Sequence, residues 1–164
     1  MPDVSREEYL SSNYKPDREY IDGNLVERNA GYGPHGHAQM AVGAALHREQ
    51  NRLSASTLMS QRVQVAETRF RVPDLCVIRK EDFSRIIQRP PLLCVEILSP
   101  DDRWSGLQDS IDDYLRFGVA EIWVIDPKEA KFWLCTRDGG VRLMSDGVLR
   151  WNGLSIDLRE ILPE

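Results

Sequence analysis

The alternation of apolar and polar residues divides this chain into short strands and helices. Two apolar, strand-like segments lie near its centre, at 70–78 and 92–98, and each contains a carboxylate, Asp74 in the first and Glu96 in the second. The apolar residues on both sides of Glu96 predict a strand buried on both faces, where an unpaired charge is costly. A partner must therefore compensate Glu96, and the candidates are an arginine and a bound cation.

Asp74 follows Pro73, and proline in a sheet is confined to edges, bulges and strand ends because it has no N–H to donate. We therefore expect the sheet to be interrupted at Asp74. If the two central segments pair, Asp74 and Glu96 create the oxygen-rich site that Mg²⁺ prefers. Each carboxylate alone has another interpretation, Glu96 as a buried ion-pair partner and Asp74 as a hydrogen-bonding residue at a strand end.

Helical spacing predicts four helical segments. Ser5 and Glu8 have the spacing of a capping box and begin a short helix that ends near Ser12. Apolar residues recur at helical intervals over 36–53 and again over 107–115, and Gly118 ends the second of these helices. A terminal turn of helix is expected over 158–161. The glycine-rich segment 29–36 is predicted to be a loop.

The remaining apolar segments predict strands. Segments 18–22 and 25–28 predict an N-terminal β-hairpin, and 57–65 predicts a single strand. Segment 92–126 has the length of a β-α-β crossover, which joins parallel strands. A C-terminal hairpin is expected from 131–136 and 141–144, with a further strand at 148–151. These elements predict an α/β fold in which helices flank a mixed sheet and a β-hairpin lies at each end.

The composition is that of an ordinary globular protein, with 41% hydrophobic and 29% charged residues. The 164 residues suit one domain over 1–164, and no apolar run reaches the roughly 20 residues that a membrane span needs. The first residues are polar and unlike a signal peptide, so we expect a cytoplasmic location. Cys76, Cys94 and Cys135 lie singly in apolar runs and are expected to be buried, reduced thiols.

Five motifs in a fixed order resemble a known family. They are Glu19-Tyr-Ile-Asp-Gly23, His37 at the start of a helix, Val72-Pro-Asp74, Val95-Glu-Ile-Leu-Ser-Pro100 and Gly118-Val-Ala-Glu-Ile-Trp-Val-Ile-Asp-Pro127. Together they are similar to the Uma-type restriction endonuclease family, a branch of the PD-(D/E)XK nuclease superfamily. The resemblance implies a restriction-endonuclease-like core and hydrolysis of DNA phosphodiester bonds that depends on Mg²⁺ or Mn²⁺.

The resemblance also implies roles for individual residues. Asp74 and Glu96 would bind the metal with the main-chain carbonyl of Ile97, while Glu19 and His37 would lie in the same pocket. A cation held by carboxylates neutralises phosphate oxygens and lowers the pKa of a bound water. Glu19 has an alternative interpretation as an exposed strand residue, and His37 as a cap or packing residue in the first turn of its helix.

The chain departs from the superfamily at the catalytic lysine. The motif places a lysine two residues beyond the glutamate, where this chain has Leu98. Uma-type members supply it from the next helix, four residues before a tyrosine, and counting from Tyr114 that position is Ser110. Serine carries no charge, so stabilisation of the transition state would depend on the metal or on Arg103. The alternatives are an active endonuclease, a degenerate relative that still binds metal, and a non-catalytic binding or assembly module on the same fold.

The charge distribution bears on the expected DNA partner. A net charge of −5 weakens binding to nucleic acid, and the helix after Glu96 is predicted to expose an acidic face formed by Asp101, Asp102, Asp109, Asp112 and Asp113. Arg69 and Arg71 share one face of a strand near Asp74, where they either contact phosphates or pair with acidic side chains.

The oligomeric state is left open by the sequence. A nuclease that cuts both strands commonly works as a symmetric pair, so a homodimer through the C-terminal hairpin around Trp133 is one expectation. Trp123 and Phe132 are aromatic residues of either the core or such an interface.

Overall fold

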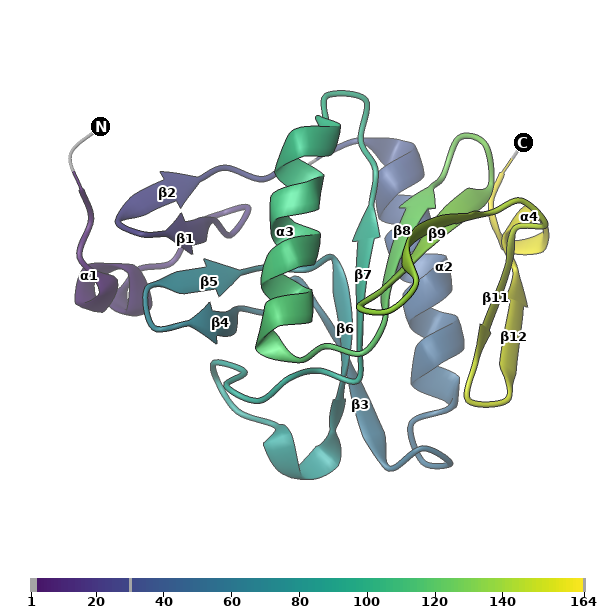
Figure 1. The fold of residues 1–164 in the computed structure, drawn as a ribbon, viewed down its shortest axis with the longest axis horizontal. Helices are drawn as coiled ribbons and strands as arrows, with labels where there is room; N and C mark the ends of the chain where they lie inside the picture. Colours follow the sequence, from purple (N-terminus) through teal and green to yellow (C-terminus); the bar gives the residue numbers. More distant parts are fainter. Residues whose placement is uncertain (1–2, 30, 164) are drawn as a thin grey trace.

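A six-stranded mixed sheet forms the centre of the computed structural model, which describes residues 3–29 and 31–163 (Figure 1). The strand order is β10-β9-β8-β7-β6-β3. The strands are β3 (Ala55–Met59), β6 (Leu75–Arg79), β7 (Leu93–Ile97), β8 (Ile122–Asp126), β9 (Lys131–Thr136) and β10 (Gly140–Met144). Only β7 and β8 run parallel among these pairs. The predicted α/β fold with a mixed sheet is confirmed.

Two helices cover opposite faces of this sheet, as Figure 1 shows. Helix α2 (Gly33–Arg48) packs on the face to which Val95 and Ile97 of β7 point. Helix α3 (Trp104–Phe117) packs on the other face, against Cys94. Because side chains alternate along a strand, β7 contributes to both cores, which explains its nearly continuous apolar sequence.

A second, four-stranded sheet has the order β2-β1-β5-β4. Its strands are β1 (Glu19–Ile21), β2 (Asn24–Val26), β4 (Val63–Ala66) and β5 (Arg69–Arg71). The short helix α1 (Arg6–Ser11) packs on it through Tyr9, whose ring stacks on Tyr20 at a centroid distance of 5.1 Å. Ser5 caps α1 by accepting a hydrogen bond from the Glu8 N–H, as the capping-box spacing predicts.

The C-terminal segment adds a small hairpin beside the core on the α2 side. The predicted strand 148–151 is β11 (Val148–Trp151), and it pairs with β12 (Leu154–Asp157), which the sequence pattern did not predict. A single helical turn, α4 (Leu158–Ile161), follows, and the 3₁₀ turn η1 (Lys80–Asp82) follows β6. Within the part of the chain that the structure describes, no helix combines the length and the apolar character needed to cross a membrane.

Both long strands predicted before Glu96 are divided between the two sheets. The prediction of one strand over 57–65 is wrong, because Ser60 adopts a left-handed conformation with φ of 47° and separates β3 from β4. Segment 70–78 is likewise split into β5 and β6 around Pro73, so the interruption expected at Asp74 is confirmed. Between β3 and β6 the chain therefore crosses between the sheets twice, and Asp74 lies at the second of these crossings.

Helix α2 begins inside the segment that was predicted to be a loop. It starts at Gly33 rather than Gly36, with Pro34 in the first turn, where proline loses no helical hydrogen bond. It ends at Arg48 rather than Leu53. Ala30 lies outside the described residues. The early start places His35 in the first turn of α2, next to the crossing at Asp74.

The predicted burial of the cysteines is confirmed, and two aromatic residues that the sequence left open between core and interface lie in the core. Cys76, Cys94 and Cys135 are buried and unpaired within the described chain. Trp123 and Phe132 are both buried on the α2 side of the sheet, so they belong to the core.

Candidate functional site

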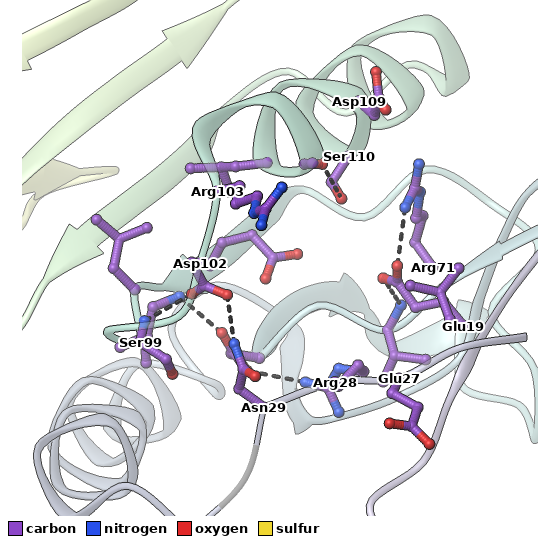
Figure 2. Close-up of a pocket in the computed structure, with 18 of the residues that line it drawn as sticks. Glu19, Glu27, Arg28, Asn29, Arg71, Ser99, Asp102, Arg103, Asp109 and Ser110 are labelled. Carbon is purple, nitrogen blue, oxygen red and sulfur yellow. Dashed lines mark hydrogen bonds and ion pairs between the residues drawn. The ribbon is translucent and has the colours of Figure 1, made fainter.

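A cleft of about 660 Å³ lies where the two sheets meet the start of α3 (Figure 2). Its walls come from β1 and β2, from the crossing between β5 and β6, from the end of β7 and from α3. Four of the five predicted site residues line it, namely Asp74, Glu96, Glu19 and Ser110, together with Ile97. The fold thus brings side chains from distant parts of the sequence into one polar site.

Asp74 is buried at the base of this cleft, and both of its carboxylate oxygens have partners. Oδ1 accepts a hydrogen bond from Arg28 Nη2 at 2.9 Å and lies 3.2 Å from His35 Nε2. Oδ2 accepts a hydrogen bond of 2.7 Å from the main-chain N–H of Ile97. The hydrogen bond to Asp74 raises the pKa of His35 despite the opposing effect of burial. Asp74 is therefore held rigidly between a β7 amide and two basic side chains.

Glu96 lies on the neighbouring strand and faces the same cleft. Leu75 pairs with Val95, so the next positions, Asp74 and Glu96, are opposite each other at the ends of β6 and β7. Tyr114 of α3 donates a hydrogen bond of 2.6 Å to Glu96 Oε1. Burial raises the pKa of Glu96 well above its ordinary range, and the nearby charge of Asp74 adds to the effect. Folding therefore shifts the protonation equilibrium of Glu96 toward the neutral carboxyl form.

Glu19 lines the cleft, but its oxygens are also occupied. Oε2 pairs with Arg71 Nη1 at 2.9 Å, and Oε1 accepts a hydrogen bond of 3.0 Å from the main-chain N–H of Val72 (Figure 2). Glu19 is 8% exposed, so the interpretation as an exposed strand residue is wrong. Its observed contacts fix the segment that leads into Asp74.

Arg69 and Arg71 bind acidic side chains instead of facing open solvent. Arg71 Nε donates to Asp113 Oδ2 at 2.7 Å, and Arg69 Nη2 donates to the same oxygen at 2.9 Å. Asp113 is 4% exposed, so the prediction that it belongs to an exposed acidic face is wrong for this residue. The sequence left two roles open for these arginines, and the structure shows the second, pairing with acidic side chains. These ion pairs connect α3 to β5.

The position of the missing lysine is occupied by Ser110, whose hydroxyl donates only a long hydrogen bond of 3.4 Å to the carbonyl of Gly106. No lysine is among the described residues that line the cleft. Arg103, at the start of α3, does line it, and Figure 2 shows its side chain between Ser110 and Asp102. Arg103 has no carboxylate partner within the described chain. The cleft therefore contains Arg103, the side chain that the sequence offered as a replacement for the missing lysine.

His37 is the predicted site residue that the structure places elsewhere. Its Nε2 lies 2.9 Å from the carbonyl oxygen of Ile161, near the C-terminal turn, and His37 does not line the cleft. The histidine in the cleft is His35, two residues earlier. The two side chains diverge because residues two positions apart do not share a helix face.

Sequence reasoning missed Arg28, His35 and Tyr114 as partners of the two central carboxylates. Pro34 was the available signal for His35, since a proline after Gly33 is typical of a first helical turn. Tyr114 was used in the sequence analysis only as the reference for locating the lysine position, and its contact with Glu96 was not predicted. No pattern in the sequence pointed to Arg28, because its contact with Asp74 spans 46 residues.

The donor chemistry at the cleft suits a hard divalent cation. Asp74 and Glu96 both contribute carboxylate groups to the cleft lining, and Mg²⁺ typically takes one or two carboxylates, several waters and substrate phosphates. Arg28 and His35, however, occupy the Oδ1 side of Asp74. No group of three or more His, Cys, Asp or Glu residues arranged for a metal occurs among residues 3–29 and 31–163. An ion here would therefore have few protein ligands and would compete with Arg28.

Comparison with known proteins agrees with this architecture. The family described as "Uma2: Putative restriction endonuclease" matches residues 6–159, nearly the whole chain. This chain belongs to that family. The resemblance inferred from the five sequence motifs is thereby confirmed.

A solved structure shows the same fold. It is the crystal structure of a "putative nuclease belonging to DUF820" from Anabaena variabilis, which is 20% identical to this chain and has a TM-score of 0.84. The match covers 96% of this chain and 97% of the other. No curated protein sequence matches the chain significantly. The family and the fold are established by these findings.

Proposed function

We propose that this member of the family is a metal-dependent endonuclease that hydrolyses DNA phosphodiester bonds at the Asp74–Glu96 cleft. One observation carries the proposal: Asp74 and Glu96, at the ends of adjacent strands, both line a cleft large enough for a phosphodiester. Mg²⁺ or Mn²⁺, when bound by these carboxylates, supplies positive charge for the phosphate oxygens and acidifies a water. We expect the Ile97 carbonyl to be the third protein ligand.

The chain's own residues would contribute positioning and charge. The Ile97 N–H fixes the Asp74 carboxylate, and Tyr114 fixes the Glu96 carboxyl. Glu96 must lose its proton to serve as an anionic ligand, and a cation in the cleft would favour that loss. Arg103 is the side chain available to stabilise the charge that builds on the phosphate, since Ser110 carries none.

The expected rate is low compared with that of a lysine-containing relative. Loss of a single well-placed group that stabilises the transition state typically costs about 10²–10³ in kcat. An arginine that enters from the helix start replaces such a lysine only in part, because its planar guanidinium has a different reach and donor geometry. Slow nicking is therefore the expected activity, and assays need long incubation.

The proposal is tested by supercoiled-plasmid nicking with Mg²⁺ or Mn²⁺. We expect nicking by the wild-type protein that is abolished by EDTA, by Asp74→Asn and by Glu96→Gln. Asp112→Asn is the matched control, because Asp112 is an acidic residue of α3 that does not line the cleft. Nicking that survives in both Asp74→Asn and Glu96→Gln would assign it to a contaminant and refute the proposal.

A second candidate is a non-catalytic binding or assembly module on the same fold. The buried ion pair between Arg28 and Asp74 favours it, because that pair satisfies the central carboxylate without any metal. Calorimetric titration with Mg²⁺ and Mn²⁺ separates the candidates. Metal binding without nicking identifies a degenerate nuclease, whereas neither metal binding nor nicking identifies the assembly module.

A further inference from the structure

Two tryptophans lie together on the α3 side of the central sheet. Trp104 is in the first turn of α3 and Trp133 is on β9, with ring centroids 5.4 Å apart and ring planes tilted by 60°. Trp104 is 45% exposed, and Leu143 on the neighbouring strand β10 is 51% exposed. Large apolar side chains that gather on a surface in this way commonly mark a binding site.

The strand register connects this pair directly to the cleft. Glu96 on β7 pairs with Val124 on β8, and Val124 pairs with Trp133 on β9. Trp133 thus lies two strands from Glu96, about 10 Å away at the usual strand spacing. From the other side, Trp104 directly follows Arg103, which lines the cleft. A ligand with a phosphate in the cleft could therefore extend its neighbouring group onto the tryptophans.

The charges around the pair indicate what that neighbouring group is. Arg103 is adjacent to Trp104, and Lys131, which also pairs with Glu129, places its Nζ 5.5 Å from the centre of the Trp133 ring, so basic side chains flank an aromatic surface. This combination binds nucleotides, because each base has a flat face and each linkage a negative phosphate. The rim also contains Asp101, Asp102 and Asp109, which repel the two phosphate backbones of a duplex.

We propose that Trp104 and Trp133 form a stacking platform for an unpaired base next to the cleft. The preferred ligand is then single-stranded DNA, or a duplex with a single-stranded end, rather than a blunt duplex. Stacking supplies affinity that does not depend on charge, which an acidic protein needs in order to hold a polyanion. This inference rests on the proposed function in taking nucleic acid as the ligand of the cleft, but it requires no cleavage.

The test is equilibrium binding in EDTA, which prevents cleavage, measured by fluorescence anisotropy. The probes are a labelled oligo(dT), a blunt hairpin duplex and the same hairpin with a single-stranded tail. We expect the wild-type protein to bind oligo(dT) and the tailed hairpin more tightly than the blunt one. Trp104→Ala should weaken binding of the first two roughly tenfold and change the third less than about twofold.

Phe83→Ala is the matched control, because Phe83 is an exposed aromatic residue, 65% accessible, that does not line the cleft. Thermal melting of each variant shows whether it is folded, and Trp104→Phe, which keeps a stacking ring, should retain most of the binding. Equal losses for single-stranded and blunt DNA, or no loss, would overturn the inference. So would a wild-type dimer in light scattering that Trp104→Ala dissociates without any change in DNA binding.

Failure of the endonuclease proposal and failure of the stacking platform give different experimental results. If the wild-type protein nicks no plasmid yet binds oligo(dT) through Trp104, the endonuclease proposal fails and the stacking platform stands. If it nicks plasmid and Trp104→Ala leaves oligo(dT) binding unchanged, the platform fails and the endonuclease stands. Absence of DNA binding in all three probes overturns the platform.

Discussion

At the scale of single residues, the main feature is that Asp74 already has three partners without a metal. Arg28, His35 and the Ile97 N–H together satisfy a carboxylate that would otherwise be buried at high cost. Removal of one partner from a buried ion pair is strongly destabilising, whereas a bound cation can replace the missing charge. The role of Arg28 can therefore be measured through folding stability as well as through activity.

We expect Arg28→Ala to lower the free energy of unfolding by about 3 kcal/mol in EDTA, because Asp74 loses its cationic partner in a largely buried site. Mg²⁺ at millimolar concentration should restore about 1 kcal/mol or more, by binding at the vacated side of Asp74. Urea denaturation with and without Mg²⁺ measures both effects.

The control is Arg150→Ala, which breaks an exposed ion pair with Asp146. It should change the free energy of unfolding by less than about 1 kcal/mol and respond little to Mg²⁺. Equal Mg²⁺ effects in the two variants would argue against a metal at Asp74.

The raised pKa of Glu96 predicts a pH-dependent stability. As the pH rises above the ordinary carboxyl pKa of 4.5, the unfolded chain releases the Glu96 proton while the folded protein retains it, so the folded state loses stability. His35 acts in the same direction: its raised pKa gives stability that is fully present below about 6.5 and is lost as the pH rises through the folded value. Just above pH 4.5, below the range in which His35 contributes, the decline should therefore come mainly from Glu96.

Glu96→Gln should remove that decline, because glutamine resembles the neutral carboxyl and does not titrate. The contribution at stake is about 1.4 kcal/mol for each pH unit in this window, measured by urea denaturation at a series of pH values in EDTA. Glu27→Gln is the control, since the Glu27 side chain is 80% exposed. A wild-type slope that persists unchanged in Glu96→Gln would show that the Glu96 carboxyl titrates normally.

The sequence predicted the two central carboxylates but not their partners. Asp74 and Glu96 were found because charges are rare in buried strands, a local signal that needs no knowledge of the fold. His37 was assigned to the pocket through the family resemblance, whereas His35 fell in the segment 29–36 that was predicted to be a loop, because the start of α2 was placed three residues too late. Arg28 could not be found at all, since only the packing of the two sheets brings it to Asp74.

At the scale of elements, a buried charge network attaches α3 to β5. Asp113 accepts hydrogen bonds from Arg69 and Arg71, and Arg71 continues the network to Glu19 of β1. The sequence placed Asp113 on an exposed face because the helix is rich in Asp, and the structure does expose its neighbours Asp109 and Asp112. The apolar residues of α3 correctly predicted which face of the helix is buried. A buried acidic residue within an acidic helix, in contrast, has no local sequence signature.

We expect Asp113→Asn to lower the free energy of unfolding by about 3–5 kcal/mol, because two partly or fully buried guanidinium groups lose their shared carboxylate. The neighbouring Asp112→Asn should change the free energy of unfolding by less than about 0.5 kcal/mol, since within the described chain the side chain of Asp112 makes a single, exposed hydrogen bond with Gln108. Guanidinium denaturation monitored by circular dichroism compares the two variants. Similar stabilities would mean that the network contributes no net energy.

The division of strands between two sheets was also beyond the sequence pattern. Alternation identified apolar segments 57–65 and 70–78 correctly, yet each supplies a strand to both sheets. Pro73 marked one of the breaks through its missing N–H, but Ser60, in a left-handed conformation that serine seldom adopts, did not mark the other. Breaks of this kind depend on tertiary packing, and they create the edge at which the cleft lies.

At the scale of the whole molecule, a polar cleft sits in a protein of net charge −5. Four of the described arginines line the cleft, and three of them, Arg28, Arg69 and Arg71, are paired with carboxylates. The fourth, Arg103, has no carboxylate partner among the described residues. An approaching nucleic acid therefore meets few cations that are available to replace its counterions. Affinity should depend only weakly on salt for this reason.

This balance predicts the salt dependence of DNA binding. Each phosphate neutralised contributes about −0.7 to the slope of log K against log salt for a single strand, so one to three contacts predict a slope of roughly −1 to −2. Anisotropy titrations of oligo(dT) over a range of NaCl concentrations measure this slope.

Two variants separate the contributions of charge and stacking. Arg103→Ala should make the slope shallower by roughly one phosphate contact. Trp104→Ala should lower affinity at every salt concentration and leave the slope unchanged, because stacking releases no counterions. A wild-type slope steeper than about −4 would mean that DNA is bound mainly on a basic surface outside the cleft.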